Sequence, residues 1–153
     1  MFHIKNHKQQ NIFDPWDYLG PKRRKELESS WAELFQKEIL SSLPVDSLRK
    51  HYHASNGRPT KELYSMLGVM ILQQMHDMTD ELAVEQFCFN IKWQYALNIT
   101  NPGDAASYLS EKSLWTMRDK LTSDGIYTEI FETTLQRLIA VFGVDLKKQT
   151  LFI

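Results

Sequence analysis

Cysteine is almost absent from this 153-residue chain, which contains only Cys88. A single cysteine excludes an internal disulfide bond and any zinc site built from paired Cys and His ligands. Cys88 stands among apolar residues, a setting that favours a small buried side chain in the reducing cytoplasm. No run of about 18 apolar residues occurs, so we predict no membrane-spanning helix. The first 15 residues also lack the apolar core of a secretory signal.

The motifs that build common active sites are missing as well. The chain has no glycine-rich phosphate loop, no GxSxG turn and no HExxH metal motif. His3 and His7 are four residues apart, but no helical pattern surrounds them. The acidic residues between 77 and 85 are explained by their place at a helix start. We therefore predict no catalytic residue, no metal, no cofactor and no small-molecule substrate.

Charge of one sign does not dominate, because the formal net charge is −1 at pH 7. Strongly basic nucleic-acid binders differ from this chain. The distribution is mildly asymmetric, since residues 1–60 carry 10 Lys and Arg against 7 Asp and Glu, whereas residues 61–153 carry 8 against 12. This balance allows a local basic surface and does not demand one.

Apolar material is plentiful, at 42% hydrophobic and 12% aromatic residues, and suffices for one domain with a real core. The stretch 57–97 holds the centre of that core. Residues 60–75 are apolar on nearly every side, which predicts a buried helix. We expect Thr60 to be its N-cap, with Lys61 and Glu62 in its first turn.

Helical spacing of apolar residues continues on both sides of this centre. Thr79 is predicted to cap the next helix. The inward face of that helix is expected to contain Leu82, Ala83, Phe87 and Ile91. Further helices are predicted at residues 21–42, 44–52, 93–99, 110–121 and 127–142, the last with Leu135 among its inward residues and Gly143 at its end.

The chain therefore reads as a mostly α protein, a single multi-helix domain of about five or six helices that allows a helix-turn-helix-like array. The domain spans residues 21–143. A tail, residues 1–20, precedes it and is expected to dock through Phe13, Trp16 and Tyr18. Residues 144–153 form a short tip with a β-strand tendency.

Two groups of residues favour contact with DNA. The basic run Lys22, Arg23, Arg24 and Lys25 opposes the dipole of a helix start, and phosphate contacts would account for it. A solvated charge run followed by glutamates is the alternative. The helix over residues 110–121 carries a polar face that resembles a recognition helix, although an ordinary surface helix explains it equally well. The candidate residues on this face are Lys112, Ser113, Thr116, Arg118 and Lys120.

Arg58 lies in a Gly-Arg-Pro sequence, the form of a minor-groove hook, although turn chemistry explains it as well. This sequence, the long apolar helix, the Thr79 restart, the aromatic block over residues 87–97 and the SxxSLWxMR helix from Ser110 form an ordered set. The set resembles the N-terminal region of bacterial insertion-sequence transposases, most closely the IS1182-like branch of the IS5-type group with its InsH-like N-terminal domain. The resemblance covers roughly residues 15–150.

This resemblance implies a helical module that recognises the double-stranded terminal repeats of the element or assists assembly. In that family the module precedes an RNase H-like domain whose acidic residues hold divalent metal ions. Asp145 lies too early to be the first catalytic aspartate, so residues 144–153 would be the start of a missing catalytic domain. We therefore expect a transposase fragment without catalytic activity of its own. The alternatives are a protein interaction module, for homo-oligomer formation or catalytic-domain docking, and a non-functional truncated remnant.

Overall fold

The fold is that of a computed structural model, which describes residues 3–46, 61–123 and 125–143, with the side chain of residue 123 excepted. Within these ranges every regular element is helical, and the prediction of a mostly α domain is confirmed. The α-helices are α1 (Gly20–Glu28), α2 (Trp31–Leu34), α4 (Leu63–Met75), α5 (Asp80–Phe89), α6 (Ile91–Ala96), α7 (Asp104–Ser107), α8 (Glu111–Ser123) and α9 (Tyr127–Phe142). Short 3-10 turns lie at Asp17–Leu19 and Leu40–Ser42, and a π-helical turn lies at Phe35–Ile39.

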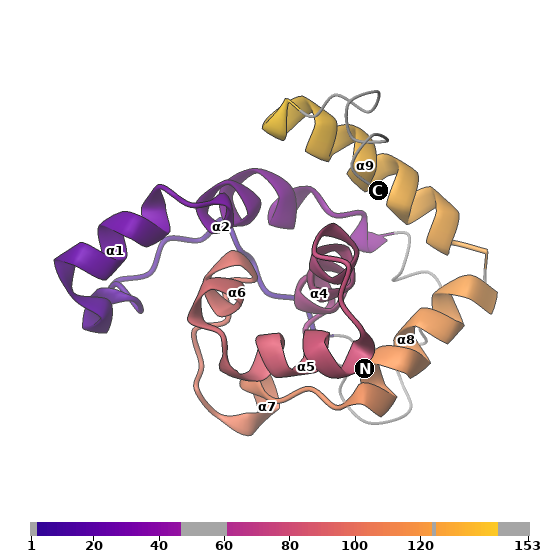
Figure 1. Ribbon diagram of the computed structural model, residues 1–153, viewed down its shortest axis with the longest axis horizontal. Coiled ribbons are helices and arrows are strands. Elements are labelled where there is room, and N and C mark those ends of the chain that lie inside the picture. Colours follow the sequence, from indigo (N-terminus) through magenta and orange to yellow (C-terminus); the bar gives the residue numbers. More distant parts are fainter. Residues whose placement is uncertain (1–2, 47–60, 124, 144–153) are drawn as a thin grey trace.

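Helix α4 lies at the centre of the molecule, with α5, α6 and α8 around it (Figure 1). Its residues are buried from Leu63 through Gln73, except for a half-buried Tyr64, so the predicted core helix is confirmed. Its start differs from the prediction. Glu62 is the N-cap, because its carboxylate accepts hydrogen bonds from the amides of Tyr64 and Ser65. Lys61 and Glu62 therefore precede the helix instead of forming its first turn.

Close packing at α4 depends on Gly68. A Cβ atom at this position would collide with a methyl group of Leu97 and would lie 3.4 Å from a methyl group of Leu40. Both leucine side chains are fully buried. The missing side chain therefore lets the end of α6 and the 3-10 turn Leu40–Ser42 approach the central helix closely.

The predicted helix over residues 21–42 is wrong as a single element, because the structure interrupts it at Ser29 and Ser30. The Ser30 side chain caps α2 by accepting a hydrogen bond from the amide of Ala32. The π-helical turn that follows has Phe35 and Ile39 fully buried, whereas Leu34 just before it is exposed. An interrupted helix places α1 to one side of the body (Figure 1).

Later in the chain the helix ends agree with the sequence better than the helix faces do. The Thr79 hydroxyl accepts from the amide of Leu82, as predicted for the N-cap of α5. The Ser110 hydroxyl accepts from the amide of Ser113 at the start of α8. Helix α9 ends at Gly143, which has a left-handed φ of 64°.

Several expected core residues are nevertheless exposed. Leu82 is 45% exposed, since α5 buries Ala83 and Phe87 instead, and Leu135 on α9 is exposed to the same extent. The first 20 residues dock through Trp16, which is buried, whereas Phe13 and Tyr18 are 85% and 63% exposed. Met75 at the end of α4 is also exposed. The core was filled by fewer residues than the apolar pattern offered.

Four predictions lie wholly or partly outside the described residues: the helix over residues 44–52, which is described only to residue 46, Arg58, the Thr60 cap and the strand-like tip over residues 144–153. The division of the chain into a tail, a domain and a C-terminal tip stays a prediction. In the described part of the chain, no helix has the length and apolar character needed to cross a membrane.

Candidate nucleic-acid interface

The basic run predicted from the sequence lies along α1, a helix that buries only Leu27. Pro21 occupies its first turn, where its missing N–H costs no hydrogen bond. Lys22 and Lys25 are exposed and form no ion pair with a described residue. The Arg23 side chain is also exposed, and its Nε donates a hydrogen bond to the carbonyl of Leu19 at 3.0 Å. Three positive charges therefore face solvent without a carboxylate partner in residues 3–46, 61–123 and 125–143.

Arg24 differs from its neighbours because its side chain is bound by other residues of the protein. Its guanidinium donates to Asp14 at 3.1 Å and to Glu28 at 2.8 Å. It also lies 5.5 Å above the ring of Tyr95, a cation–π arrangement. The Tyr95 hydroxyl donates to the carboxylate of Glu33, and its burial together with that bond raises the pKa of Tyr95. Arg24 therefore attaches α1 to α6.

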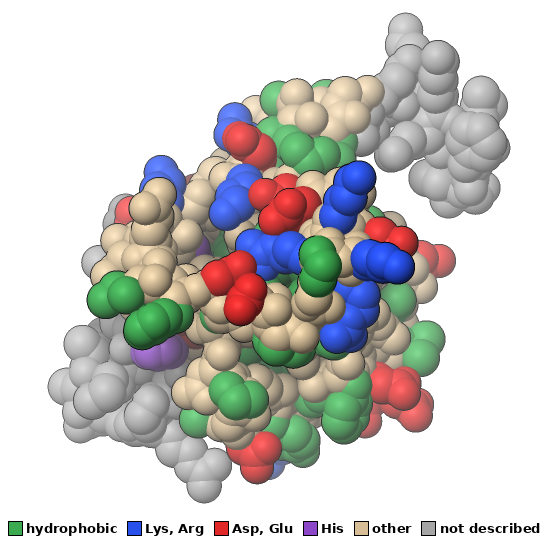
Figure 2. Space-filling view, turned by 90° about the vertical axis from the view of Figure 1, so that its left-hand side faces the viewer, with side chains coloured by type: hydrophobic (Ala, Val, Ile, Leu, Met, Phe, Trp, Pro, Cys, Tyr) green, Lys and Arg blue, Asp and Glu red, His purple; other side chains and the backbone are tan. Residues whose placement is uncertain are grey.

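The end of the molecule formed by α1 and α6 gathers Lys and Arg side chains, with Asp and Glu between them (Figure 2). An open hollow runs between the two helices. It is lined by Leu19, Arg23, Glu26, Leu27, Ile91 and Lys92. Lys92 at the start of α6 is exposed and adds a cation that the sequence reasoning missed. Its isolated position in the sequence gave no sign that it lies across a hollow from α1.

The second predicted group lies on α8, where Lys112, Ser113 and Thr116 are exposed and Lys120 is partly buried. The Ser113 hydroxyl accepts from the Ser110 hydroxyl at 3.0 Å, so it takes part in the helix cap. The element directly before α8 is the single-turn helix α7, which is shorter than the first helix of a helix-turn-helix unit. The exposed face also carries acidic residues at positions 111 and 119.

Arg118 is the α8 residue whose surroundings decide its role most clearly. Its guanidinium binds both carboxylate oxygens of Asp80 on α5 and donates to the Gln73 side-chain oxygen at 3.1 Å. The hydrogen bond from Arg118 holds the pKa of Asp80 below its usual value, against the opposing effect of burial. Arg118 thus joins α8 to both α4 and α5.

A buried polar cluster at the start of α4 was missed by the sequence reasoning. His7 lies 2.6 Å from the Glu62 carboxylate through Nε2, and its Nδ1 lies 3.1 Å from the amide nitrogen of Asn98. Because an ionised carboxylate only accepts hydrogen bonds, His7 Nε2 is the donor to Glu62. Lys5 donates to the Asn98 carbonyl at 2.9 Å and to the Thr100 hydroxyl at 3.1 Å. The cluster fixes the N-terminal stretch on the body.

Metal ligands and reactive cysteine were also sought among the described residues. No group of three or more His, Cys, Asp or Glu residues there is placed to hold a metal ion. Cys88 is partly buried, and its sulfur lies 3.7 Å from the carbonyl oxygen of Leu109. Its position agrees with a small packed side chain between α5 and the start of α8.

Comparison with known proteins identifies the family of this chain. No curated protein and no solved structure matches the chain. A model of the transposase domain DUF772 matches residues 23–120, which include the central helix α4 and most of α1 and α8. The match covers well over half of the sequence and agrees with the resemblance to the N-terminal region of insertion-sequence transposases. The chain belongs to the DUF772 transposase-domain family.

Proposed function

We propose that this helical domain is a DNA-binding and assembly module of a transposase, with no catalytic activity of its own. Its ligand is double-stranded DNA at the ends of a mobile element. The observation that carries the proposal is the set of exposed cations on α1, where Lys22, Arg23 and Lys25 have no carboxylate partner among the described residues. Lys22 and Arg23 lie near the start of α1, where positive charges oppose the helix dipole and do not stabilise the fold, whereas Lys25 lies in its last turn. Phosphate groups would complement them.

The α1 surface is a better candidate than α8 for this contact. In the part of the chain that the structure describes, only Arg24 on α1 has carboxylate partners, whereas on α8 the guanidinium of Arg118 is bound by Asp80. The α8 face also mixes Lys112 with two acidic residues. We therefore place the phosphate contacts on α1 and across the hollow at Lys92. We assign Arg118 a structural role instead of a DNA contact.

The test is a fluorescence anisotropy titration of the full chain against a labelled duplex of about 30 base pairs that carries element-end sequence, repeated between about 50 and about 200 mM salt. We expect the double variant Lys22→Glu, Lys25→Glu to bind at least about tenfold more weakly. We also expect it to reduce the slope of log affinity against log salt by about 2, one unit for each lost phosphate contact.

Two control variants carry the same change in net charge at other sites. Lys112→Glu with Lys120→Glu tests the α8 surface, and Lys8→Glu with Lys37→Glu tests exposed lysines outside both surfaces. The α1 placement is wrong if the α8 pair weakens binding more. Binding that falls equally in all three variants would indicate a response to net charge alone. No salt-dependent binding of the wild-type chain to any duplex would refute the proposal as a whole.

A protein interaction function is the second candidate, and exposed apolar side chains favour it. Trp115 on α8 is 58% exposed, and Leu135 lies on the outer side of α9. Large exposed apolar residues often mark partner surfaces. Light scattering across a concentration series, with and without the last eight residues, tests self-association. A strict monomer at every concentration argues against a homo-oligomer.

A further inference from the structure

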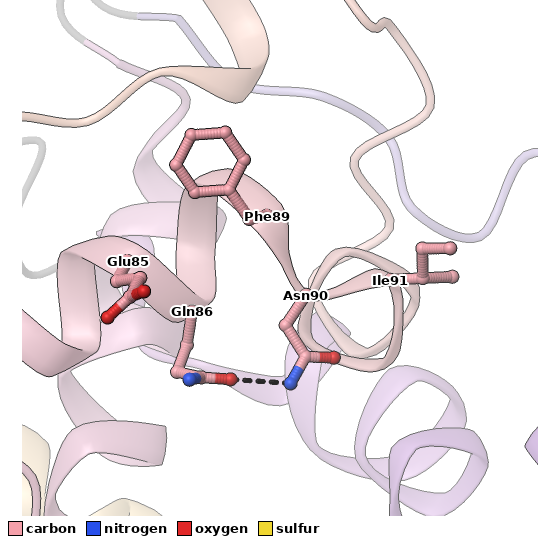
Figure 3. Close-up of a pocket in the computed structure, with 5 residues that line it drawn as sticks. All are labelled: Glu85, Gln86, Phe89, Asn90 and Ile91. Atoms are coloured by element: carbon pink, nitrogen blue, oxygen red, sulfur yellow. Dashed lines mark hydrogen bonds between the residues drawn. The ribbon is translucent and has the colours of Figure 1, made fainter.

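The end of α5 presents an aromatic side chain that the fold does not use. Phe89 is 81% exposed on the last turn of the helix, although the other phenylalanine of α5, Phe87, is buried. Together with Glu85, Gln86, Asn90 and Ile91 it lines an open hollow (Figure 3). In the figure, Phe89 projects away from the side chains of Gln86 and Asn90. Its ring is therefore available to a partner.

Hydrogen bonds keep the corner between α5 and α6 rigid. The Asn90 side chain accepts from the amide of Lys92 at 2.8 Å, which caps α6, and donates to the side chain of Gln86. The Gln94 side chain donates to the carbonyl of Cys88 at 2.9 Å, which satisfies the end of α5. These bonds fix the backbone on both sides of Phe89. An exposed aromatic residue on a fixed corner loses little conformational freedom when it binds.

The hollow beside Phe89 adjoins the hollow between α1 and α6. Ile91 lines the hollow at Phe89 and also the hollow that holds Arg23 and Lys92. The two hollows therefore meet at Ile91, with the exposed ring at one of them and the cations Arg23 and Lys92, together with Glu26, at the other. Glu85 stands at the other end and marks an acidic edge. Charge complementarity thus directs a phosphate chain from Phe89 towards α1, away from Glu85.

We propose that Phe89 stacks on an unstacked base of the DNA whose phosphates are held by Arg23, Lys92 and the lysines of α1. This inference rests on the DNA-binding function proposed above. Aromatic side chains that contact DNA beside cations either insert between base steps or stack on an unpaired base. Both contacts favour DNA that is already locally unpaired, because the cost of unstacking has been met.

The test compares an intact duplex with the same duplex carrying one mismatched or unpaired position, with 2-aminopurine at that position as a stacking reporter. We expect the wild-type chain to prefer the interrupted duplex by about tenfold, a difference within the range of one base–aromatic stack. Phe89→Ala should abolish this preference and the change in 2-aminopurine fluorescence. The salt dependence should stay unchanged, because no cation is removed. Phe89→Trp should retain the preference.

Leu82→Ala and Trp115→Ala are matched controls, since each removes an exposed apolar side chain at another surface. Two results would overturn the inference while leaving DNA binding intact: equal affinity of the wild type for both duplexes, or a preference that survives in Phe89→Ala. A self-associating chain that becomes monomeric in Phe89→Ala with unchanged DNA binding would assign the ring to a contact between copies. Loss of all salt-dependent binding would instead refute the proposed function.

Discussion

Arg118 distinguishes a structural contact from a DNA contact, and its replacement by glutamine tests which one it makes. The guanidinium makes two hydrogen bonds to Asp80 and one to Gln73, and both members of the ion pair keep 28% of their side-chain surface exposed. Removing the guanidinium leaves the carboxylate of Asp80 without its cation and the side-chain oxygen of Gln73 without its donor from Arg118. These contacts join three helices, so their loss lowers the stability of the whole domain.

The magnitude follows from the exposure of the pair. Fully exposed ion pairs contribute about 0.2–1 kcal/mol, whereas breaking a buried one costs about 3–5 kcal/mol. The partly buried pair of Arg118 and Asp80 lies between these limits. We expect Arg118→Gln to lower the free energy of unfolding by about 1–2 kcal/mol, which corresponds to a fall in Tm of roughly 3–6 °C for a chain of this size. Arg118→Lys should recover less than half of the loss, because an ammonium group cannot bind both carboxylate oxygens.

Urea unfolding followed by tryptophan fluorescence measures this change, and Lys112→Gln on the same helix is the control. That variant removes one exposed charge and should stay within about 0.5 kcal/mol of the wild type. Combining Arg118→Gln with Asp80→Asn completes a double-mutant cycle that isolates the coupling. The structural role of Arg118 is refuted if Arg118→Gln unfolds like the wild type while the salt slope of DNA binding falls by about one unit.

Two further predictions concern the start and the middle of α4. Burial alone would raise the pKa of Glu62, but the hydrogen bond and charge of His7, with the Tyr64 amide and the Ser65 hydroxyl, hold it below the usual value of 4.5. Glu62 therefore stabilises the folded state fully above pH 4.5, and this stabilisation is lost as the pH falls through the lower folded-state pKa of Glu62. Glu62→Gln should thus destabilise the domain at pH 7 and flatten its acid unfolding curve. Equal acid profiles for the variant and the wild type would contradict this. Gly68→Ala should destabilise the domain by about 1–2 kcal/mol despite the better helix propensity of alanine, because the added methyl displaces Leu97. Unchanged stability in thermal unfolding would show that Leu97 can move without cost.

The sequence predicted helix positions well where local chemistry decides them. Thr79 and Ser110 supply hydroxyl caps, and Gly143 supplies the left-handed residue that ends α9. The cap of α4 was predicted wrongly because the N-cap is a glutamate, Glu62, and the apolar pattern did not single out its position. The break at Ser29 and Ser30 was missed because the apolar spacing continues through it, and only the serine chemistry marks the cap.

Side-chain exposure and pairing were harder to predict, because they depend on distant partners. Arg118 and Lys112 are similar residues in one helical pattern, but only Arg118 meets Asp80, which lies 38 positions earlier. Arg24 and Lys25 are neighbours in a basic run, yet only Arg24 binds carboxylates. Phe87 and Phe89 are two residues apart on α5, and packing against α4 buries only Phe87. Each contrast comes from tertiary contacts that no local pattern contains.

These contrasts suggest that the proposed DNA surface has two parts, one for general affinity and one for discrimination between DNA structures. Helix α1 buries only Leu27 of its nine residues and is separated from α2 by the break at Ser29 and Ser30. Its exposed lysines suit contacts to phosphates, which add affinity on any sequence. The corner that carries Phe89 is instead fixed by hydrogen bonds at both sides, and discrimination between DNA structures requires such a fixed group. A change on α1 should therefore scale affinity for all duplexes alike, whereas a change at Phe89 should alter only the preference among them.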